Sequence, residues 1–533
     1  MIDTKALRQK ILDLAIRGKL VPQDPDDEPA SVLLERIRQQ KQQMVKEGKL
    51  KPKDIKNDSV IFVGEDNLHY EKFADGSVKC IEDEVPFGLP DGWAWVRLGN
   101  LSAAIQYGLS NSAEPQGTHR LLRITDIQDG KVDWNAVPFT TVNDPEAYLL
   151  KTGDIVFART GATVGKSFLI TETPYPSVYA SYLIRIRLLG SLSPEYIYQF
   201  FDSACYWSQI TDKSVGVGQP NCNGTSLKEL FIPLPPISEQ LRIVPTAQAL
   251  LAYVAKIDAE KKSLLSIIMA TKSKILDLAI RGQLIPQDPN DEPASVLLER
   301  IRAEKEELIK QGKIKRDKKE SVIFRGEDNS YYEKVGSDVI CIDAEIPFEI
   351  PDTWEWMRLE SCCIKEIRRG KSPTYIDESG TLVFAQKCNT KYRGIDVGLA
   401  LFLDESILGR YPDDEYMQDG DVVINSTGTG TLGRVGIYHM TDNHRGLPIV
   451  PDSHVTVVRA AHGIQSIYVY AFMKANQSEL EKEGEGSTNQ KELKPLTLKE
   501  MLIPIPPYSE QERIVATITA AFSTISAVEK SLN

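Results

Sequence analysis

Hydrophobic residues in two segments of the chain recur at alternating spacings of four and three residues, the pattern of a coiled-coil seam. In residues 238–282 the seam passes through Ile243, Ala247, Leu250, Val254, Ile257, Lys261, Leu264, Ile268, Thr271, Ile275 and Leu278. In residues 508–533 it passes through Ile514, Ile518, Ala521, Ile525, Val528 and Leu532. The pattern predicts two long helices, the first about 65 Å long at 1.5 Å per residue.

Shorter patterns predict strands and a further helix. Residues 153–166 (GDIVFARTGATVGK) and 420–434 (GDVVINSTGTGTLGR) each hold an apolar run followed by glycines, which is typical of a strand, a loop and a second strand. In DEPASVLLERIR, Val32, Leu33 and Ile37 are expected on one side of an amphipathic helix. The chain therefore combines helices and strands.

The sequence also contains an internal repeat with a period of about half its length. Residues Lys10–Arg38 return as Lys274–Arg302 with only three differences. Residues 99–230 and 360–501 match only in short fragments. A duplicated scaffold thus carries two different inserts. This is expected if the repeated flanks make the same contact twice while the two inserts contact two different targets. Further paired landmarks are SVIF at Ser59 and Ser321, WxW at Trp93 and Trp354, GD(I/V)V at Gly153 and Gly420, and IPxPPxSEQxRIV at Ile232 and Ile503.

The repeat is circularly closed. Residues 4–20 (TKALRQKILDLAIRGKL) match the distal part of the central helix, residues 271–284 (TKSKILDLAIRGQL). We therefore expect the two termini to lie side by side, with the N-terminal helix completing a second long helix antiparallel to the central one. A coiled coil that only joins two copies of the chain is the alternative.

Composition and charge narrow the class of protein. The 533 residues are 41% hydrophobic and 26% charged, which is typical of several soluble globular domains. Charged residues stand where a secretory signal would be apolar, so we expect a cytoplasmic protein. Neither a structural metal nor a disulfide is expected, because the seven cysteines form no CxxC and do not cluster with the six histidines. The net charge of −12 argues against a protein that coats nucleic acid nonspecifically, because such proteins are basic.

Three stretches depart from the catalytic motifs that they approach. Thr160–Ser167 (TGATVGKS) has threonine where a P-loop needs glycine, and GTGTLGRV from Gly428 has Arg-Val in place of Lys-Ser/Thr. Pro25-Asp26 with Glu47-Gly48-Lys49 fits a loose metal-nuclease pattern, but the repeat replaces Asp26 by asparagine. Ile505-Pro-Pro-Tyr508 lacks the polar first residue of an amino-methyltransferase signature and is expected to end a strand before a helix. We assign no catalytic residue and no metal site.

The circular repeat, the paired IPxPPxSEQxRIV segments and the two WxW(V/M)RL segments together resemble the specificity (S) subunits of type I restriction-modification enzymes. The resemblance covers essentially the whole chain. It implies a multidomain α/β (α+β) fold in which two mixed α/β target-recognition domains are separated by two long antiparallel coiled-coil helices, in a circular pseudo-twofold repeat. Each recognition domain would read one half of a split sequence in double-stranded DNA.

The same resemblance implies partners. Two modification subunits would supply S-adenosylmethionine binding and adenine methylation, and restriction/translocase subunits would use ATP and Mg for translocation and cleavage. This chain would carry no cofactor and would direct catalysis without performing it. The expected division is an N-terminal helix (1–20), a connector (21–92), recognition domain 1 (93–236), the central helix (237–284), a repeated connector (285–353), recognition domain 2 (354–507) and a C-terminal helix (508–533).

A DNA reader needs donors for phosphates and side chains that pair with base edges. In the first insert LLRITDI matches the family's early strand motif, and the glycine-rich loop follows it. The candidate residues there are Arg123, Thr125, Asp126, Arg159, Thr160, Thr163 and Lys166. In the second insert the candidates are Arg368, Arg369 and Lys371 in a basic turn, Gln386, Lys387 and Asn389 at the early strand, and Asn425, Ser426, Thr427, Thr429 and Arg434 in the glycine-rich loop.

Two other functions are kept as rivals. A coiled-coil scaffold could join two protein ligands without reading DNA, and a nucleotide hydrolase could use residues 160–167. The role of the connectors is also open: they either widen the contact with a partner or pack on their own recognition domain.

Overall fold

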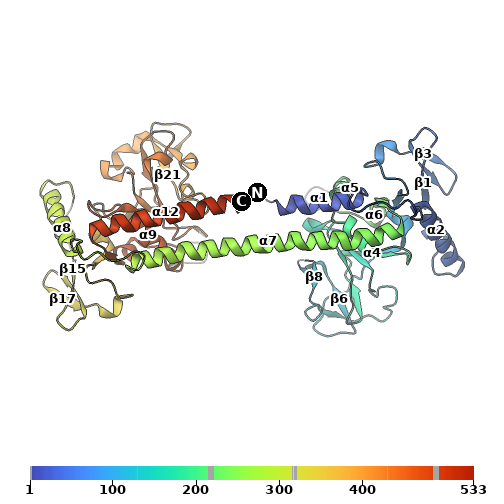
Figure 1. Ribbon diagram of the computed structural model, residues 1–533, viewed down its shortest axis with the longest axis horizontal. Coiled ribbons are helices and arrows are strands. Elements are labelled where there is room, and N and C mark those ends of the chain that lie inside the picture. The colour runs from blue at the N-terminus through green and yellow to red at the C-terminus, as the bar shows by residue number, and fades with distance from the viewer. Residues whose placement is uncertain are drawn as a thin grey trace. The chain divides into compact units, whose positions relative to one another are not determined.

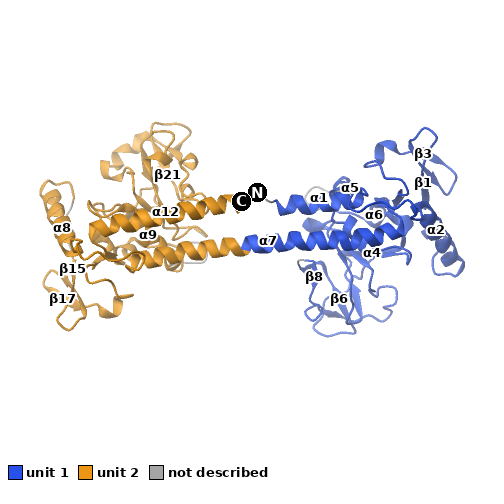
Figure 2. Ribbon diagram, in the orientation of Figure 1, with its two compact units in different colours: residues 1–262 blue, residues 263–533 orange. Residues whose placement is uncertain are grey.

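The computed structural model describes residues 3–128, 130–213, 221–314, 316, 321–428, 430–483 and 491–532. The chain divides into two compact units, unit 1 (1–262) and unit 2 (263–533), coloured separately in Figure 2. The division falls inside α7 (Ile237–Ile280), a single helix of 44 residues. This helix spans nearly all of the longer predicted seam.

Unit 1 starts with α1 (Thr4–Ile16), followed by α2 (Ala30–Lys46) and the antiparallel sheet β1-β2-β3 (Figure 1). β4 (Ala94–Arg97) then pairs with β14 (Phe231–Leu234), so the chain enters and leaves the next domain side by side. That domain contains a four-stranded sheet, β11-β10-β13-β5, and a three-stranded sheet, β12-β6-β9. The strand bounds are Ser59–Val63 (β1), His69–Phe73 (β2), Val78–Cys80 (β3), Ser102–Tyr107 (β5), His119–Leu122 (β6), Ile127–Gln128 (β7), Lys131–Val132 (β8), Phe139–Thr140 (β9), Ile155–Ala158 (β10), Ser167–Leu169 (β11), Ser177–Tyr179 (β12) and Leu183–Leu188 (β13). The helices are α3 (Leu98–Leu101), α4 (Pro194–Phe200), α5 (Ala204–Lys213) and α6 (Gly224–Lys228).

Unit 2 repeats this order from the distal part of α7 onwards. α8 (Ala294–Lys310) and the sheet β15-β16-β17 precede β18 (Glu355–Arg358), which pairs with β27 (Leu502–Ile505). The enclosed domain contains the sheets β19-β26-β23-β24 and β20-β22-β21-β25. The strand bounds are Ser321–Arg325 (β15), Tyr331–Val335 (β16), Asp338–Cys341 (β17), Arg368–Arg369 (β19), Tyr375–Ile376 (β20), Leu382–Phe384 (β21), Leu401–Leu403 (β22), Val422–Asn425 (β23), Val435–Ile437 (β24), Ile449–Pro451 (β25) and Val455–Val458 (β26). The helices are α9 (Ser466–Ala475), α10 (Gln477–Leu480), α11 (Pro495–Lys499) and α12 (Tyr508–Leu532).

The two enclosed domains share the arrangement of their central strands although their sequences differ. In unit 1 the central strand β10 pairs antiparallel with β11 and β13, and in unit 2 β23 pairs the same way with β24 and β26. The second sheets correspond too, because β6 runs parallel to β12 and β21 runs parallel to β25. The predicted strand, loop and strand are present in both copies, and the mixed α/β prediction is confirmed.

In unit 1 a short antiparallel helix pair carries the domain. Ile11 of α1 packs in one buried cluster with Ala247 and Val254 of α7. The hydroxyl of Thr4 donates a hydrogen bond to Asp258 Oδ1 at 3.1 Å. Later residues of α1 thus contact earlier residues of α7, so the two helices run in opposite directions.

In unit 2 α12 takes the place that the first part of α7 has in unit 1. Ile514 and Ile518 pack in one cluster with Leu276 and Ala279 of distal α7. Lys272 Nζ lies 2.7 Å from Glu529 Oε2. Each unit therefore contains one complete copy of the repeat, as the circular match predicted. Whether the termini lie side by side concerns the placement of one unit against the other and stays a prediction.

The seam is only partly buried along α7. Ile243, Ala247, Val254 and Ile268 are buried, whereas Leu250 and Leu264 are each 38% exposed. Polar Thr271 is exposed as well. Short contacts with the domains, rather than one continuous coiled coil, therefore account for part of the apolar pattern.

The repeated landmarks form matching anchors in both units. Trp93 Nε1 donates a hydrogen bond to Glu239 Oε2 at 2.8 Å, and Trp354 Nε1 donates to Glu510 Oε2 at 2.9 Å. Ion pairs join Arg242 to Asp27 and Arg513 to Asp291. The WxW and EQxR segments thus tie the connector, the enclosed domain and the following helix into one body, which explains why these segments occur together twice.

The connectors pack on their own units. Leu33 and Ile37 of α2 are buried in the core cluster that contains Trp93 and Leu98. Val32, which the sequence placed on the same side, is instead exposed, because it lies one residue from Leu33 and so about 100° away around the helix. α8 is buried in the same way in unit 2. Among the described residues, no helix is long and apolar enough to cross a membrane.

Candidate nucleic-acid interface

The glycine-rich loop of unit 1 closes a β-hairpin. Ala158 donates its N–H to the Lys166 carbonyl at 2.8 Å, and Gly165 donates to the Ala158 carbonyl at 3.1 Å. Gly165 has φ +89° and leads directly into β11. A P-loop would instead lead into a helix whose N-terminus binds phosphate. The hairpin therefore lacks the geometry of a nucleotide-hydrolysis site.

The candidates on this hairpin are arranged around its turn. The guanidinium of Arg159 lies 4.8 Å from the ring centre of Tyr107, a cation–π contact. Thr163 donates its hydroxyl to the carbonyl of Thr160 at 3.2 Å. Lys166 is exposed. Arg159 is thus held against an aromatic ring while the ammonium of Lys166 faces solvent.

Thr125 and Asp126 lie on the turn η3 (Ile124–Asp126), which follows β6, and Arg123 is the residue just before this turn. Arg123 donates to both oxygens of Asp126, at 3.1 and 2.7 Å, and this ion pair raises the pKa of Arg123. Thr125 is exposed. Arg123 and Asp126 are therefore paired with each other, and Thr125 is the candidate that faces outward.

A short loop between β12 and β13 joins these two groups. Ala180 donates its N–H to the Leu122 carbonyl at 2.9 Å, and Arg159 donates to the Tyr182 carbonyl at 3.1 Å. The side chain of Tyr182 is 65% exposed between them. Sequence reasoning missed Tyr182 because it follows an ordinary apolar strand, and no motif marks it.

Unit 2 contains the corresponding hairpin with different side chains. Arg434 occupies the place of Lys166, because Asn425 donates its N–H to the Arg434 carbonyl at 3.0 Å. The Arg434 guanidinium donates to the carbonyls of Asn389 and Gly430, at 2.8 and 2.9 Å. It is half-buried, so part of its hydrogen-bonding capacity serves the loop itself.

Three polar candidates of unit 2 point inward. Asn389 and Asn425 are buried, and their side-chain amides lie 3.3 Å apart. Ser426 is buried too, with its hydroxyl 2.6 Å from that of Thr456. These side chains hold the hairpin to neighbouring strands. Thr429 lies outside the described residues.

Other candidates of this unit face outward. Lys387 is exposed on the turn η7 (Gln386–Cys388), in the place that Thr125 has on η3. Gln386 accepts a hydrogen bond from Thr431 at 3.3 Å and is half-buried. The Thr427 hydroxyl lies 2.8 Å from Nδ1 of His454, which is exposed.

His454 is the unit 2 counterpart of Tyr182. Its carbonyl accepts from the N–H of Ser426 at 2.8 Å, as the Tyr182 carbonyl accepts from Arg159. The two loops therefore have one backbone arrangement and different exposed side chains, Tyr182 in unit 1 and His454 in unit 2. Both can stack on bases or donate hydrogen bonds.

Residues 368–371 of unit 2, predicted to form a basic turn, begin instead with strand β19 (Arg368–Arg369), which pairs with β26, and their side chains have acidic and carbonyl partners. Arg368 lies 3.1 Å from Asp414 and 2.6 Å from Glu415. Arg369 donates to the Leu493 carbonyl at 2.8 Å and pairs with Glu492. Lys371 donates to a backbone carbonyl. The charge of this segment is thus partly neutralised inside the domain, which weakens its case as a phosphate site.

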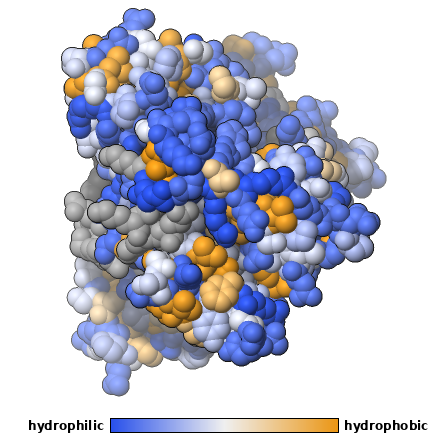
Figure 3. Space-filling model, turned by 90° about the vertical axis from the view of Figure 1, so that its left-hand side faces the viewer, coloured by the Kyte–Doolittle hydropathy of each residue, from blue (hydrophilic) through white to orange (hydrophobic). Residues whose placement is uncertain are grey.

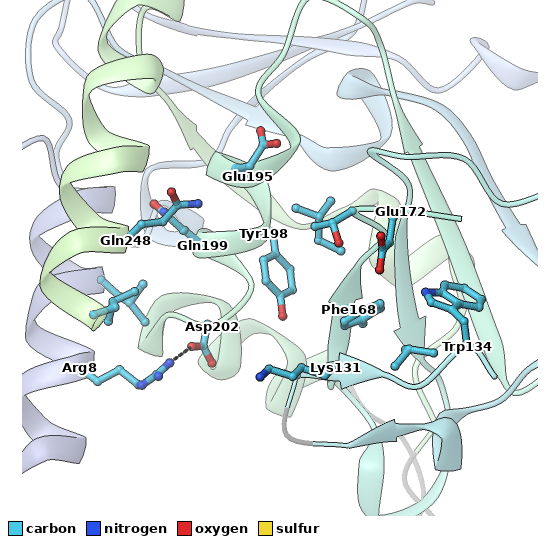
Figure 4. A pocket seen from close by; sticks show the side chains of 16 residues that line it. Arg8, Lys131, Trp134, Phe168, Glu172, Glu195, Tyr198, Gln199, Asp202 and Gln248 are labelled. Atoms are coloured by element: carbon cyan, nitrogen blue, oxygen red, sulfur yellow. Dashed lines mark hydrogen bonds and ion pairs between the residues drawn. The ribbon is translucent and has the colours of Figure 1, made fainter. Parts of the chain in front are cut away.

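A separate cavity of about 500 Å³ lies in unit 1 between the helix pair and the domain (Figure 4). Arg8 of α1 and Asp202 form an ion pair at 3.2 Å on one side, and Lys131, Trp134 and Phe168 lie on the other. Burial raises the pKa of Asp202. None of the candidate reading residues lines this cavity. In the described part of the chain, no group of three or more His, Cys, Asp or Glu side chains could hold a metal ion.

Comparison with known proteins decides the family. The model of the type I restriction modification DNA specificity domain matches residues 90–267 and again 351–533. The chain belongs to this family. The two matches coincide with the two domains whose glycine-rich hairpins correspond, and each extends into the helix that follows.

Relatives and a solved structure agree with this assignment to the specificity family. The chain is 27% identical over 598 residues to the type I restriction enzyme EcoEI specificity subunit of Escherichia coli, covering 99% of this chain and 90% of the relative. It is 30% identical over 418 residues to the EcoAI specificity subunit of Escherichia coli, covering 67% and 62%. A chain solved in work on complex assembly and conformational transition of the type I R-M system has a TM-score of 0.51 at 18% identity, covering 84% and 94%. That last likeness supports the fold.

Proposed function

We propose that this chain is the specificity subunit of a type I restriction-modification complex. Each recognition domain reads one half of a bipartite sequence in double-stranded DNA. The observation that carries the proposal is the pair of equivalent hairpins and turns, which keep one backbone arrangement while their exposed side chains differ. Equivalent surfaces with different side chains are what two different half-sites require.

The proposed readers are the candidate side chains that are exposed or half-buried on these elements. In unit 1 they are Thr125, Arg159, Thr160, Thr163 and Lys166, joined by Tyr182; in unit 2 they are Gln386, Lys387, Thr427 and Arg434, joined by His454. Thr429 remains a sequence-based candidate. Arg123, Asp126, Arg368, Arg369 and Lys371 act mainly through their ion pairs and carbonyl contacts, and Asn389 and Ser426 support the hairpin from inside.

The proposed partners are two modification subunits and the restriction/translocase subunits. The partners bind S-adenosylmethionine, ATP and Mg and perform adenine methylation and cleavage, whereas this chain contributes sequence readout. The domain division follows the sequence boundaries: recognition domains at 93–236 and 354–507, connectors at 21–92 and 285–353, and helices at 1–20, 237–284 and 508–533. The scaffold alternative is disfavoured because both recognition domains match a DNA specificity model.

Selection from random duplexes tests the proposal. The full chain, assembled with its modification subunits, is incubated with a randomised DNA library, and bound molecules are sequenced. The expected result is two short conserved blocks separated by a gap of fixed length and free sequence. Enrichment of a single uninterrupted block, or of none, would overturn the bipartite readout.

A further inference from the structure

The connector sheet of each unit uses only one of its faces for packing. On the inner face of the unit 1 sheet, Ile61 packs in a cluster with Ile81 and Trp95, and Glu71 forms a buried ion pair with Arg97 at 2.7 Å. Side chains alternate between the two faces of a strand. The remaining side chains therefore form an outer face, which consists of Val60, Phe62, Tyr70, Lys72, Val78 and Cys80 in unit 1 and Val322, Phe324, Tyr332, Lys334, Val339 and Cys341 in unit 2.

Apart from Lys72 and Lys334 the outer face is apolar; its side chains are half-buried or exposed, and their types are the same in both units. The rings of Phe62 and Tyr70 stack with centroids 5.8 Å apart, and those of Phe324 and Tyr332 stack at 5.9 Å. Both phenylalanines are exposed. Figure 3 looks onto the end of unit 2 where this sheet lies and shows apolar side chains among hydrophilic ones. A repeated cluster of exposed aromatic and aliphatic side chains on a folded surface marks an interaction site.

Each sheet also ends in a free strand edge. In the described residues β3 pairs only with β2, and β17 pairs only with β16. Ile81 donates to the His69 carbonyl at 2.9 Å, so alternation along an antiparallel ladder turns the N–H and C=O groups of Val78 outward. The matching bond from Ile342 to Tyr331 turns those of Val339 outward. Val78 and Val339 are each 53% exposed.

The chain segments that form both sheets carry more acidic than basic side chains. Residues 59–92 contain eight acidic and two basic side chains, and residues 321–353 contain the same numbers, giving a formal charge of −6 for each. A surface of this charge repels DNA phosphates. It attracts a partner whose apolar contact is flanked by lysine or arginine.

We propose that the outer face and free edge of each connector sheet bind an extended apolar segment, flanked by lysine or arginine, of a partner protein. The segment adds a strand beside β3 or β17, one copy to each unit. An unpaired edge gives main-chain hydrogen bonds, and alternate side chains of the segment contact the apolar outer face. The duplication of the surface implies two copies of one partner.

The partner class rests on the proposed function, under which the modification subunit is present twice. The inference goes further by assigning a contact to the sheets, away from the helices and the recognition domains. The acidic surface and the DNA-reading surface are thus separate parts of the same unit, so their tests are independent.

Variants that introduce a positive charge test the surface. In the double variant Val78→Arg and Val339→Arg, a cation is placed at both edges, and affinity for the purified modification subunits is expected to fall at least tenfold. Val63→Arg is the matched control: Val63 is 56% exposed on the same sheet but lies outside the outer face, and its repeat counterpart is already Arg325. Equal affinity of the double variant and the control would contradict the proposal, provided that both show the thermal stability of the parent.

Cysteine labelling gives a second readout on the unaltered chain. Cys80 and Cys341 are exposed on the outer faces, whereas Cys222, Cys362 and Cys388 are buried. Maleimide should label Cys80 and Cys341 rapidly in the free chain and slowly in complex with the modification subunits, while a DNA duplex alone should leave both rates unchanged. Unchanged labelling in the complex with the modification subunits would overturn the inference. If that complex still methylates one bipartite motif, the proposed function survives this failure.

Discussion

At the residue scale, each unit has one buried glutamate that links the long helix to the WxW segment. Glu239 accepts from the indole of Trp93, and Glu510 accepts from that of Trp354. Burial raises the pKa of both carboxyls, and the indole hydrogen bonds act in the opposite direction. These groups therefore bind a proton more tightly in the folded chain than in the unfolded chain, where a glutamate titrates near about 4.3.

This difference predicts the pH dependence of stability. As pH rises from about 4.3 through the higher folded pKa, the unfolded chain loses its proton first, so the free energy of unfolding falls. Glu239→Gln keeps an oxygen acceptor for Trp93 and should remove this slope. Glu239→Ala, which leaves the indole N–H unpaired, should cost about 1–3 kcal/mol. Urea denaturation of unit 1 monitored by tryptophan fluorescence at several pH values checks both; parallel curves for parent and Glu239→Gln would refute the assignment.

Lys166 is a candidate reader of unit 1 whose ammonium group faces solvent. In Lys166→Ala the slope of log affinity against log salt should decrease in magnitude by about 0.9, with weaker binding to every sequence. Lys151 is also exposed but precedes the opposite end of β10, so Lys151→Ala serves as a matched control. Fluorescence anisotropy of the complex on a duplex, at several salt concentrations, measures the slopes. Equal slopes for the two variants would place Lys166 away from the DNA.

At the element scale, the glycine-rich hairpins show how one backbone serves two sequences. Gly165 has φ +89°, and an added Cβ would lie 2.5 Å from the Trp207 ring. Gly161 has φ +71° but open space around it. The two positions separate backbone strain from steric overlap within a single loop.

Gly161→Ala should therefore destabilise unit 1 by about 1 kcal/mol, the cost of a left-handed backbone alone. Gly165→Ala should cost clearly more, because the ring of Trp207 must also move. Thermal unfolding of both variants checks the order. A smaller loss for Gly165→Ala than for Gly161→Ala would contradict the described packing.

The sequence predicted these elements better than it predicted their contacts. The apolar runs before Gly161 and Gly428 indicated strands because a buried strand can be recognised from a short stretch of sequence. The inward positions of Asn389 and Ser426 were not predictable, since a polar side chain in a loop looks the same whether it caps a strand or faces solvent. The bond between Trp93 and Glu239 joins residues 146 positions apart, and only the repeat of both landmarks hinted at it.

At the scale of the whole molecule, the chain is two copies of one unit with a helix, α7, shared between them. The repeat predicted this division because the N-terminal helix matches the end of α7. Each copy keeps its own core and its own candidate reading surface. Variants in one unit should therefore change one half of the recognised sequence and leave the other half intact.

Modified-base sequencing of the source genome tests the central claim most directly. It is carried out with the gene intact, with the gene deleted, and with a Tyr182→Ala variant of the full chain. The account predicts that deletion removes N6-methyladenine from one split motif, and that the variant relaxes bases in only one of its two halves. Unchanged methylation after deletion at an expressed locus would contradict the function, and a change in both halves would contradict independent readout by the two units.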